Sequence, residues 1–139
     1  GARISPDGKY LAFSSNDSGR VNVYVQAMPP NFGKWQISVN GGVEPRWRRD
    51  GKELFFLALA QKMMAVDVNL GSTVTVGIPH PLFQLPPYSV LGQRYDVSAD
   101  GQRFLIFTPS SSTGNVPITV VMNWWAELKK NKASSRPND

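Results

Sequence analysis

The chain has 139 residues, of which 41% are hydrophobic, with a formal net charge of +5 and no cysteine. This size and apolar content suffice for about one domain with its own core, and the lack of cysteine excludes disulfides, thiolate metal sites and thiol catalysis. No apolar run approaches the roughly 20 residues of a membrane helix, and the N-terminus shows no charged region followed by an apolar one, as a signal peptide would.

One phrase occurs three times along the chain, each time around an Asp-Gly pair. The pairs are Asp7-Gly8, Asp50-Gly51 and Asp100-Gly101, separated by 43 and then 50 residues. In such a pair glycine supplies the positive φ of a tight turn, and the aspartate accepts a hydrogen bond from an N–H two residues on. We therefore assign all six residues to hairpin turns. The spacing is that of four-stranded propeller blades.

Apolar and aromatic runs around these turns predict the strands in chain order. The first unit predicts strands at residues 2–5, 9–15, 21–27 and 34–39. The second predicts strands at 44–48, 53–59, 62–68 and 80–85, followed by a crossing segment that contains Pro86-Pro87. The third predicts strands at 94–98, 103–108 and 117–123, with no fourth strand. About eleven strands in repeats of blade length predict an all-β fold built of β-propeller blades.

The C-terminal segment departs from the strand pattern. Residues 124–130, Trp-Trp-Ala-Glu-Leu-Lys-Lys, predict a short helix that Asn123 caps and whose lysines suit the helix dipole. We expect a partial propeller over 1–130, with blades at about 2–41, 43–85 and 93–123 plus the helix, and a disordered tail over 131–139. Because the chain starts inside a repeat, we expect it to be a piece of a longer protein.

The repeats carry a resemblance to a known family. The stretch Ser5-Pro6-Asp7-Gly8-Lys9-Tyr10-Leu11-Ala12-Phe13, the strand Asn22-Val23-Tyr24-Val25 and the exit Ile37-Ser38-Val39-Asn40-Gly41-Gly42 resemble the TolB-type β-propeller, with its PD or WD-like repeats. Residues 93–104 and 118–124 are similar to the C-terminal end of propellers appended to bacterial serine/threonine protein kinases. Arg48-Arg49 and Ala99 depart from the Ser-Pro of the first repeat without disturbing the Asp-Gly turn.

This resemblance implies a bacterial ligand-sensing or interaction domain, outside the cytoplasm as in periplasmic TolB-like proteins. Propellers of the family usually close with about six blades, so just under three blades are half of a ring. The uncovered sheet edges require a partner, and a twofold homodimer would close a six-bladed ring. Missing upstream blades of the native protein are the alternative. The kinase signature sequences themselves are absent from the chain.

Residues able to carry catalysis are sparse. His80, the sole histidine, lies between Pro79 and Pro81, and no Gly-x-Ser-x-Gly sequence accompanies it. Zinc requires three or four ligands at typical spacings, and the three turn aspartates belong to separate repeats. We therefore predict no catalytic residue, no metal and no cofactor.

The favoured function is a noncatalytic module that binds a protein, a peptide or a small ligand through its loops. Its candidate interaction surface comprises Arg46, Trp47, Arg48, Arg49, Tyr88 and Arg94. One alternative is an accessory propeller that gates a hydrolase, like those fused to some serine peptidases. Another is a binder of nucleic acid or another anionic polymer, which the net charge allows but the scattered basic residues do not favour.

Overall fold

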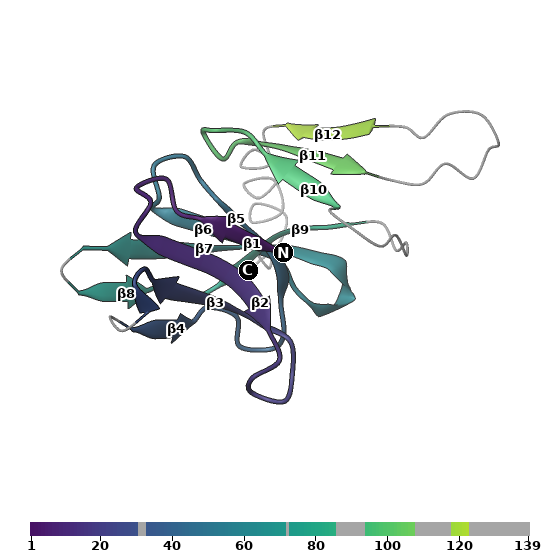
Figure 1. The fold of residues 1–139 in the computed structure, drawn as a ribbon. Helices are drawn as coiled ribbons and strands as arrows, with labels where there is room; N and C mark the ends of the chain where they lie inside the picture. Colours follow the sequence, from purple (N-terminus) through teal and green to yellow (C-terminus); the bar gives the residue numbers. More distant parts are fainter. Residues whose placement is uncertain (31–32, 72, 86–93, 108–117, 123–139) are drawn as a thin grey trace, which may run out of the picture.

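The computed structural model describes residues 1–30, 33–71, 73–85, 94–107 and 118–122. Over these ranges it is an all-β protein whose strands form three antiparallel sheets, in agreement with the predicted propeller blades. In Figure 1 the third sheet, coloured green to yellow, lies above the other two. The predicted helix at 124–130, the tail at 131–139 and Tyr88 lie outside the described residues.

The first sheet is a four-stranded meander. Its strands, in spatial and sequence order, are β1 (Ala2–Ile4), β2 (Tyr10–Ser15), β3 (Asn22–Ala27) and β4 (Lys34–Gln36). Asn22 holds the segment that follows β4, because its Oδ1 accepts hydrogen bonds from the Ser38 hydroxyl at 2.9 Å and from the Gly41 N–H at 3.0 Å. The chain then enters the next sheet directly.

The middle sheet contains one strand that the sequence analysis did not predict. Its strands are β5 (Val43–Trp47), β6 (Glu53–Leu57), β7 (Lys62–Leu70), β8 (Val74–Val76) and β9 (His80–Gln84), with a 3-10 turn, η2 (Leu59–Gln61), before β7. The position beside β7 is shared, since β9 pairs with the first part of β7 and β8 with the last part. The β7–β8 hairpin therefore extends beyond β6.

The third sheet consists of β10 (Tyr95–Val97), β11 (Arg103–Phe107) and β12 (Ile118–Met122), in that order. The described part of the chain thus holds twelve strands, and eleven of them overlap the predicted ranges.

The three sheets stack face to face through two hydrophobic clusters. The first cluster lies between the first and middle sheets and contains Ala12, Val23, Val25, Ile37, Leu54, Phe56, Val66 and Val68. The second lies between the middle and third sheets and contains Phe55, Leu57, Met63, Ala65, Leu82, Leu85, Tyr95, Phe104 and Ile106. Alternate residues of β6 enter alternate clusters because successive side chains of a strand point to opposite faces. Leu54, Phe55, Phe56 and Leu57 are consequently all buried.

Candidate functional site

Each Asp-Gly pair forms the same hydrogen-bonded turn. The carboxylate of Asp7 accepts the N–H of Lys9 at 3.1 Å, and the equivalent bonds from the second and third turns reach Lys52 and Gln102 at 3.0 Å. The glycines have φ values of 74°, 71° and 74°, the left-handed region that glycine adopts without strain. These turns join the first two strands of each sheet.

Hydrogen bonds stabilise the charged form of all three turn aspartates. Burial raises the pKa of Asp7, but the Ser5 hydroxyl and the Lys9 N–H outweigh it, so that the pKa lies below its usual value. The Arg48 guanidinium lowers the pKa of Asp50, and the Ser98 hydroxyl lowers that of Asp100. The three carboxylates therefore remain ionised around neutral pH.

The turns lie next to one another and form a continuous row on one side of the stacked sheets. A Cβ built on Gly51 would lie 3.7 Å from Cδ of Pro6 in the first turn. The Arg49 N–H donates to the Ala99 carbonyl at 3.2 Å, which links the second turn to the third. Successive sheets are thus connected through their turns as well as their cores.

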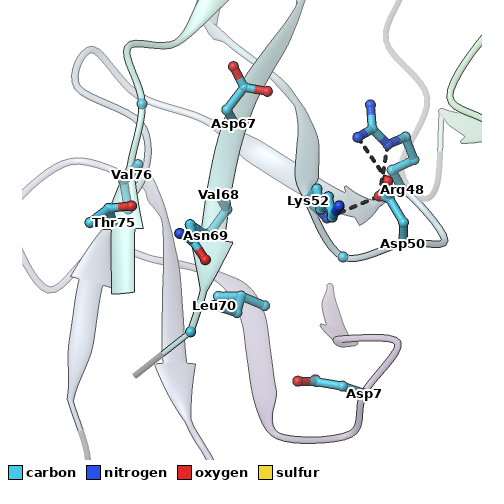
Figure 2. A pocket seen from close by; sticks show the side chains of 13 residues that line it. Asp7, Arg48, Asp50, Lys52, Asp67, Val68, Asn69, Leu70, Thr75 and Val76 are labelled. Atoms are coloured by element: carbon cyan, nitrogen blue, oxygen red, sulfur yellow. Dashed lines mark hydrogen bonds and ion pairs between the residues drawn. The ribbon is translucent and has the colours of Figure 1, made fainter. Parts of the chain in front are cut away.

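A cavity of about 860 Å³ opens beside this row, between the first two turns and the β7–β8 hairpin (Figure 2). It is lined by Asp7, Arg48, Asp50, Gly51, Lys52, Asp67, Val68, Asn69, Leu70, Gly71, Thr75, Val76 and Gly77. Val68 belongs to the first cluster, and Leu70 and Val76 pack against it, so the hairpin gives the cavity an apolar wall. Asp7, Asp50 and Lys52 contribute polar groups from the opposite side in Figure 2.

The charges around the cavity fall into a fixed set and an exposed set. Arg48 is fixed, since its Nε lies 2.8 Å from Asp50 Oδ1 and its Nη1 lies 2.6 Å from Glu53 Oε2. Burial raises the pKa of Glu53, and the charge of Arg48 opposes this shift. By contrast, the side chains of Lys52 and Asp67 are exposed on the rim. The cavity therefore offers both positively and negatively charged side chains next to an apolar wall.

The structure disperses the predicted interaction residues instead of gathering them at this cavity. Of the five described members of this surface, only Arg48 lines the cavity, and Arg49 is exposed on the same turn. Arg46 is 6% exposed, its guanidinium lies over the Tyr95 ring, and burial lowers its pKa. Trp47 donates its indole N–H to the Arg3 carbonyl at 3.1 Å.

The last described member of the predicted surface, Arg94, pairs with Glu44, with Nε and Oε1 2.8 Å apart. Glu44 lies in β5, the first strand of the middle sheet, and Arg94 lies just before β10, so the pair connects neighbouring sheets. Arg46 acts across the same junction, since its Nε lies 3.8 Å from Asp96 Oδ1. Both arginines thus contribute to packing between sheets.

Cavity residues from β7 and β8 escaped the sequence analysis. Asn69 and Thr75 are cross-strand partners in the hairpin, and both are exposed. The alternation Val74-Thr75-Val76 between Gly71 and Gly77 was the signal that could have revealed β8. His80 is the first residue of β9, opposite Ala65.

Metal-binding clusters and membrane-spanning helices can be assessed only for the described residues. Within these ranges no group of three or more histidine or acidic side chains is placed to hold a metal ion. None of the helical segments described here has the length and apolarity to cross a membrane.

Comparisons with known proteins bear on the fold. Neither the models of protein families nor the curated proteins give a match to this chain. Among solved structures, the crystal structure of TolB from Acinetobacter baumannii matches with a TM-score of 0.60 and 20% sequence identity. The match covers 88% of this chain and 29% of the TolB chain. The chain therefore has a TolB-like β-propeller fold and corresponds to less than a third of the length of that protein.

Proposed function

We propose that the chain is a noncatalytic module of a larger bacterial protein that binds a protein or peptide partner. The observation that carries this proposal is the cavity of about 860 Å³ beside the row of Asp-Gly turns. Binding residues occur preferentially on loops that a rigid scaffold positions, and the stacked sheets are such a scaffold. A concave site with an apolar wall and a few polar groups is the usual form of a ligand site.

A peptide fits the groups that line this cavity. Leu70 and Val76 offer apolar contact, while Asn69 and Thr75 can exchange hydrogen bonds with backbone amides. The exposed Lys52 and Asp67 can pair with side chains of either charge. A highly charged polymer fits less well, because Asp7, Asp50 and Asp67 line the same cavity as Arg48 and Lys52.

The experiment is a selection of short peptides from a random display library against the whole chain. Peptides that use the cavity should bind the unsubstituted protein and lose binding when Thr75→Trp fills it. Thr75 is exposed on a strand, where tryptophan is well accepted, so this variant should keep its fold. Its circular dichroism spectrum and melting temperature verify this point.

Ile78→Trp is the matched control, because Ile78 is 89% exposed and does not line the cavity. It should bind the selected peptides as the unsubstituted chain does. Failure to enrich any peptide, or equal binding by Thr75→Trp and the control, would refute the cavity as the interaction site.

A second interaction belongs to the same proposal: the chain associates with another copy of itself to complete a propeller ring. The outward faces of the first and third sheets carry apolar side chains that are half-buried or exposed, among them Leu11, Phe13 and Phe107. In a propeller each blade is covered on both sides.

A further inference from the structure

Within the described residues, one edge of β7 has no neighbouring strand where β7 extends past β6. The last hydrogen bond on this side is donated by the Val68 N–H to the Lys52 carbonyl, at 2.9 Å. Before Lys52 the chain belongs to the Asp50-Gly51 turn, which leads back to β5. β7 continues to Leu70, so its end lies beside the cavity, between β8 and the turn that carries Lys52 (Figure 2).

The backbone of Leu70 points to this open edge. Successive residues of a strand direct their N–H and C=O groups alternately to one side and to the other. Asp67 faces β8, since its carbonyl accepts the Gly77 N–H at 2.8 Å, and Val68 faces the side of β6. Leu70, two residues after Val68, therefore directs its N–H and C=O to the side where β6 is no longer present.

The Asp-Gly turn also leaves the Val68 carbonyl open. In a complete antiparallel pair, Lys52 would return a hydrogen bond from its own N–H to Val68. That N–H donates instead to Asp50 Oδ1 at 3.0 Å, within the turn. The Val68 carbonyl and the N–H and C=O of Leu70 thus form an edge along the cavity. An extended chain can pair with such an edge.

The charges near this edge favour a basic peptide. Leu70 packs against the first cluster, and Asp7, from the sheet across that cluster, also lines the cavity. The Asp7 carboxylate is ionised around neutral pH. Asp67 is exposed on the opposite face of β7. In the part of the chain that the structure describes, Asp7 and Asp67 form no salt bridge, whereas Asp50 does.

A lysine or arginine satisfies both kinds of group on the Leu70 face. Its aliphatic stem can pack on the Leu70 side chain while its charged end lies near the Asp7 carboxylate. The peptide residues next to it in sequence would point to the other face, where Asp67 and Asn69 line the cavity.

We propose that the peptide partner of the cavity binds as an added β-strand along the open edge of β7, with a lysine or arginine over Leu70. Its backbone accepts the Leu70 N–H and donates to the carbonyls of this edge, so that main-chain bonds supply affinity and alternate side chains supply specificity. The inference rests on the proposed function, since the peptide occupies the same cavity, and it specifies the binding mode and the charge.

Amide hydrogen exchange of the whole chain, followed by NMR, tests the pairing with and without a peptide from the display selection. With the peptide at about ten times its Kd, exchange of the Leu70 amide should slow by about tenfold, because this N–H becomes hydrogen-bonded in the complex. Val76 is the matched control, since the same alternation directs its N–H to the outer edge of β8. Slowing at Val76, or none at Leu70, would overturn the inference.

Single N-methyl groups placed along the synthetic peptide provide a second measurement. Methylation of alternate amides should abolish binding and methylation of the amides between them should be tolerated, because only every second amide of an added strand faces β7. A peptide that loses binding to Thr75→Trp without this alternation occupies the cavity in another way. The proposed function would then stand, and strand addition would be refuted.

Asp7→Asn tests the basic residue, since asparagine suits the turn but carries no charge. It should weaken binding of the selected peptide by about threefold, the effect of losing a partly exposed ion pair. Asp100→Asn is the control, because Asp100 accepts the same turn bond in the third sheet and does not line the cavity. Equal affinities of the two variants, or selected peptides without lysine or arginine, would contradict the assigned charge.

Discussion

The carboxylate of Glu44 accepts two hydrogen bonds from Arg94, one from Nε at 2.8 Å and one from the backbone N–H at 2.9 Å. Both side chains are less than one-fifth exposed, and they come from adjacent sheets. Glu44 has a φ of 56°, which an L-residue adopts only at a cost that its surroundings compensate. Its carbonyl also accepts the Tyr95 hydroxyl at 2.7 Å. The junction between the middle and third sheets thus has a polar clamp beside its apolar core.

Replacing Arg94 with alanine should lower the free energy of unfolding by about 2 kcal/mol, because it leaves the Glu44 carboxylate partly buried without its charged donor. Urea denaturation measures the change. Arg103→Ala is the control, since Arg103 is exposed on β11 and should change stability by less than about 0.5 kcal/mol. Equal effects of the two substitutions would contradict a specific role for the pair.

Gly8 and Gly101 allow the backbone and packing requirements of the turns to be separated. Both have a φ of 74°, so alanine is strained at either position by about 1 kcal/mol. At Gly8 a Cβ meets nothing within 4 Å, whereas at Gly101 it would lie 3.0 Å from Arg48 Cδ and 3.1 Å from Phe55 Cζ. Gly101→Ala should therefore reduce the melting temperature more than Gly8→Ala. Equal reductions would show that the third turn can shift freely.

Asp50→Asn removes the charge paired with Arg48 while retaining a residue suited to the turn. Because the pKa of Asp50 in the folded chain lies below its usual 3.8, the ionised form contributes stability at and above that pH, and this contribution disappears as the pH falls through the folded-state pKa. The variant should be less stable by about 0.5 kcal/mol at neutral pH, since the pair is largely exposed.

Thermal melts from neutral pH down into the acid range test this expectation. The curves of Asp50→Asn and the unsubstituted chain should converge below the pKa of the folded state. A difference that stays constant in acid would mean that the charge is not its cause.

Phe104→Ala should destabilise the chain by about 3–5 kcal/mol, because it empties a fully buried site at the second cluster. The Phe104 ring meets Phe55 edge-on at 5.1 Å between centroids and Phe83 at 5.2 Å. Leu59→Ala, at a side chain that is 62% exposed, is the control and should have little effect in the same urea experiment. A loss below about 1 kcal/mol at Phe104 would mean that the sheets are not held by this cluster.

The blades were predictable because their features can be recognised in short stretches of sequence. Each turn requires an Asp-Gly pair, and the strands on either side of it require apolar residues at alternate positions. Strand β8 was missed since Val74–Val76 is short and pairs only with the overhanging end of β7. The cavity was unpredictable for the same reason: Asn69 and Thr75 line it only because β7 extends past β6 and pairs there with β8. Sequence also could not show that Arg46 is buried, because burial there depends on Tyr95, 49 residues away.

The alternation along β6 has a consequence for how the molecule unfolds. Leu54 and Phe56 belong to one cluster and Phe55 and Leu57 to the other. Loss of packing in either cluster therefore exposes one side of β6. Units that share an interface in this way melt together, as the repeats of a solenoid do. Heat should therefore disrupt the described sheets in one cooperative transition, with the middle sheet acting as the element that couples its two neighbours.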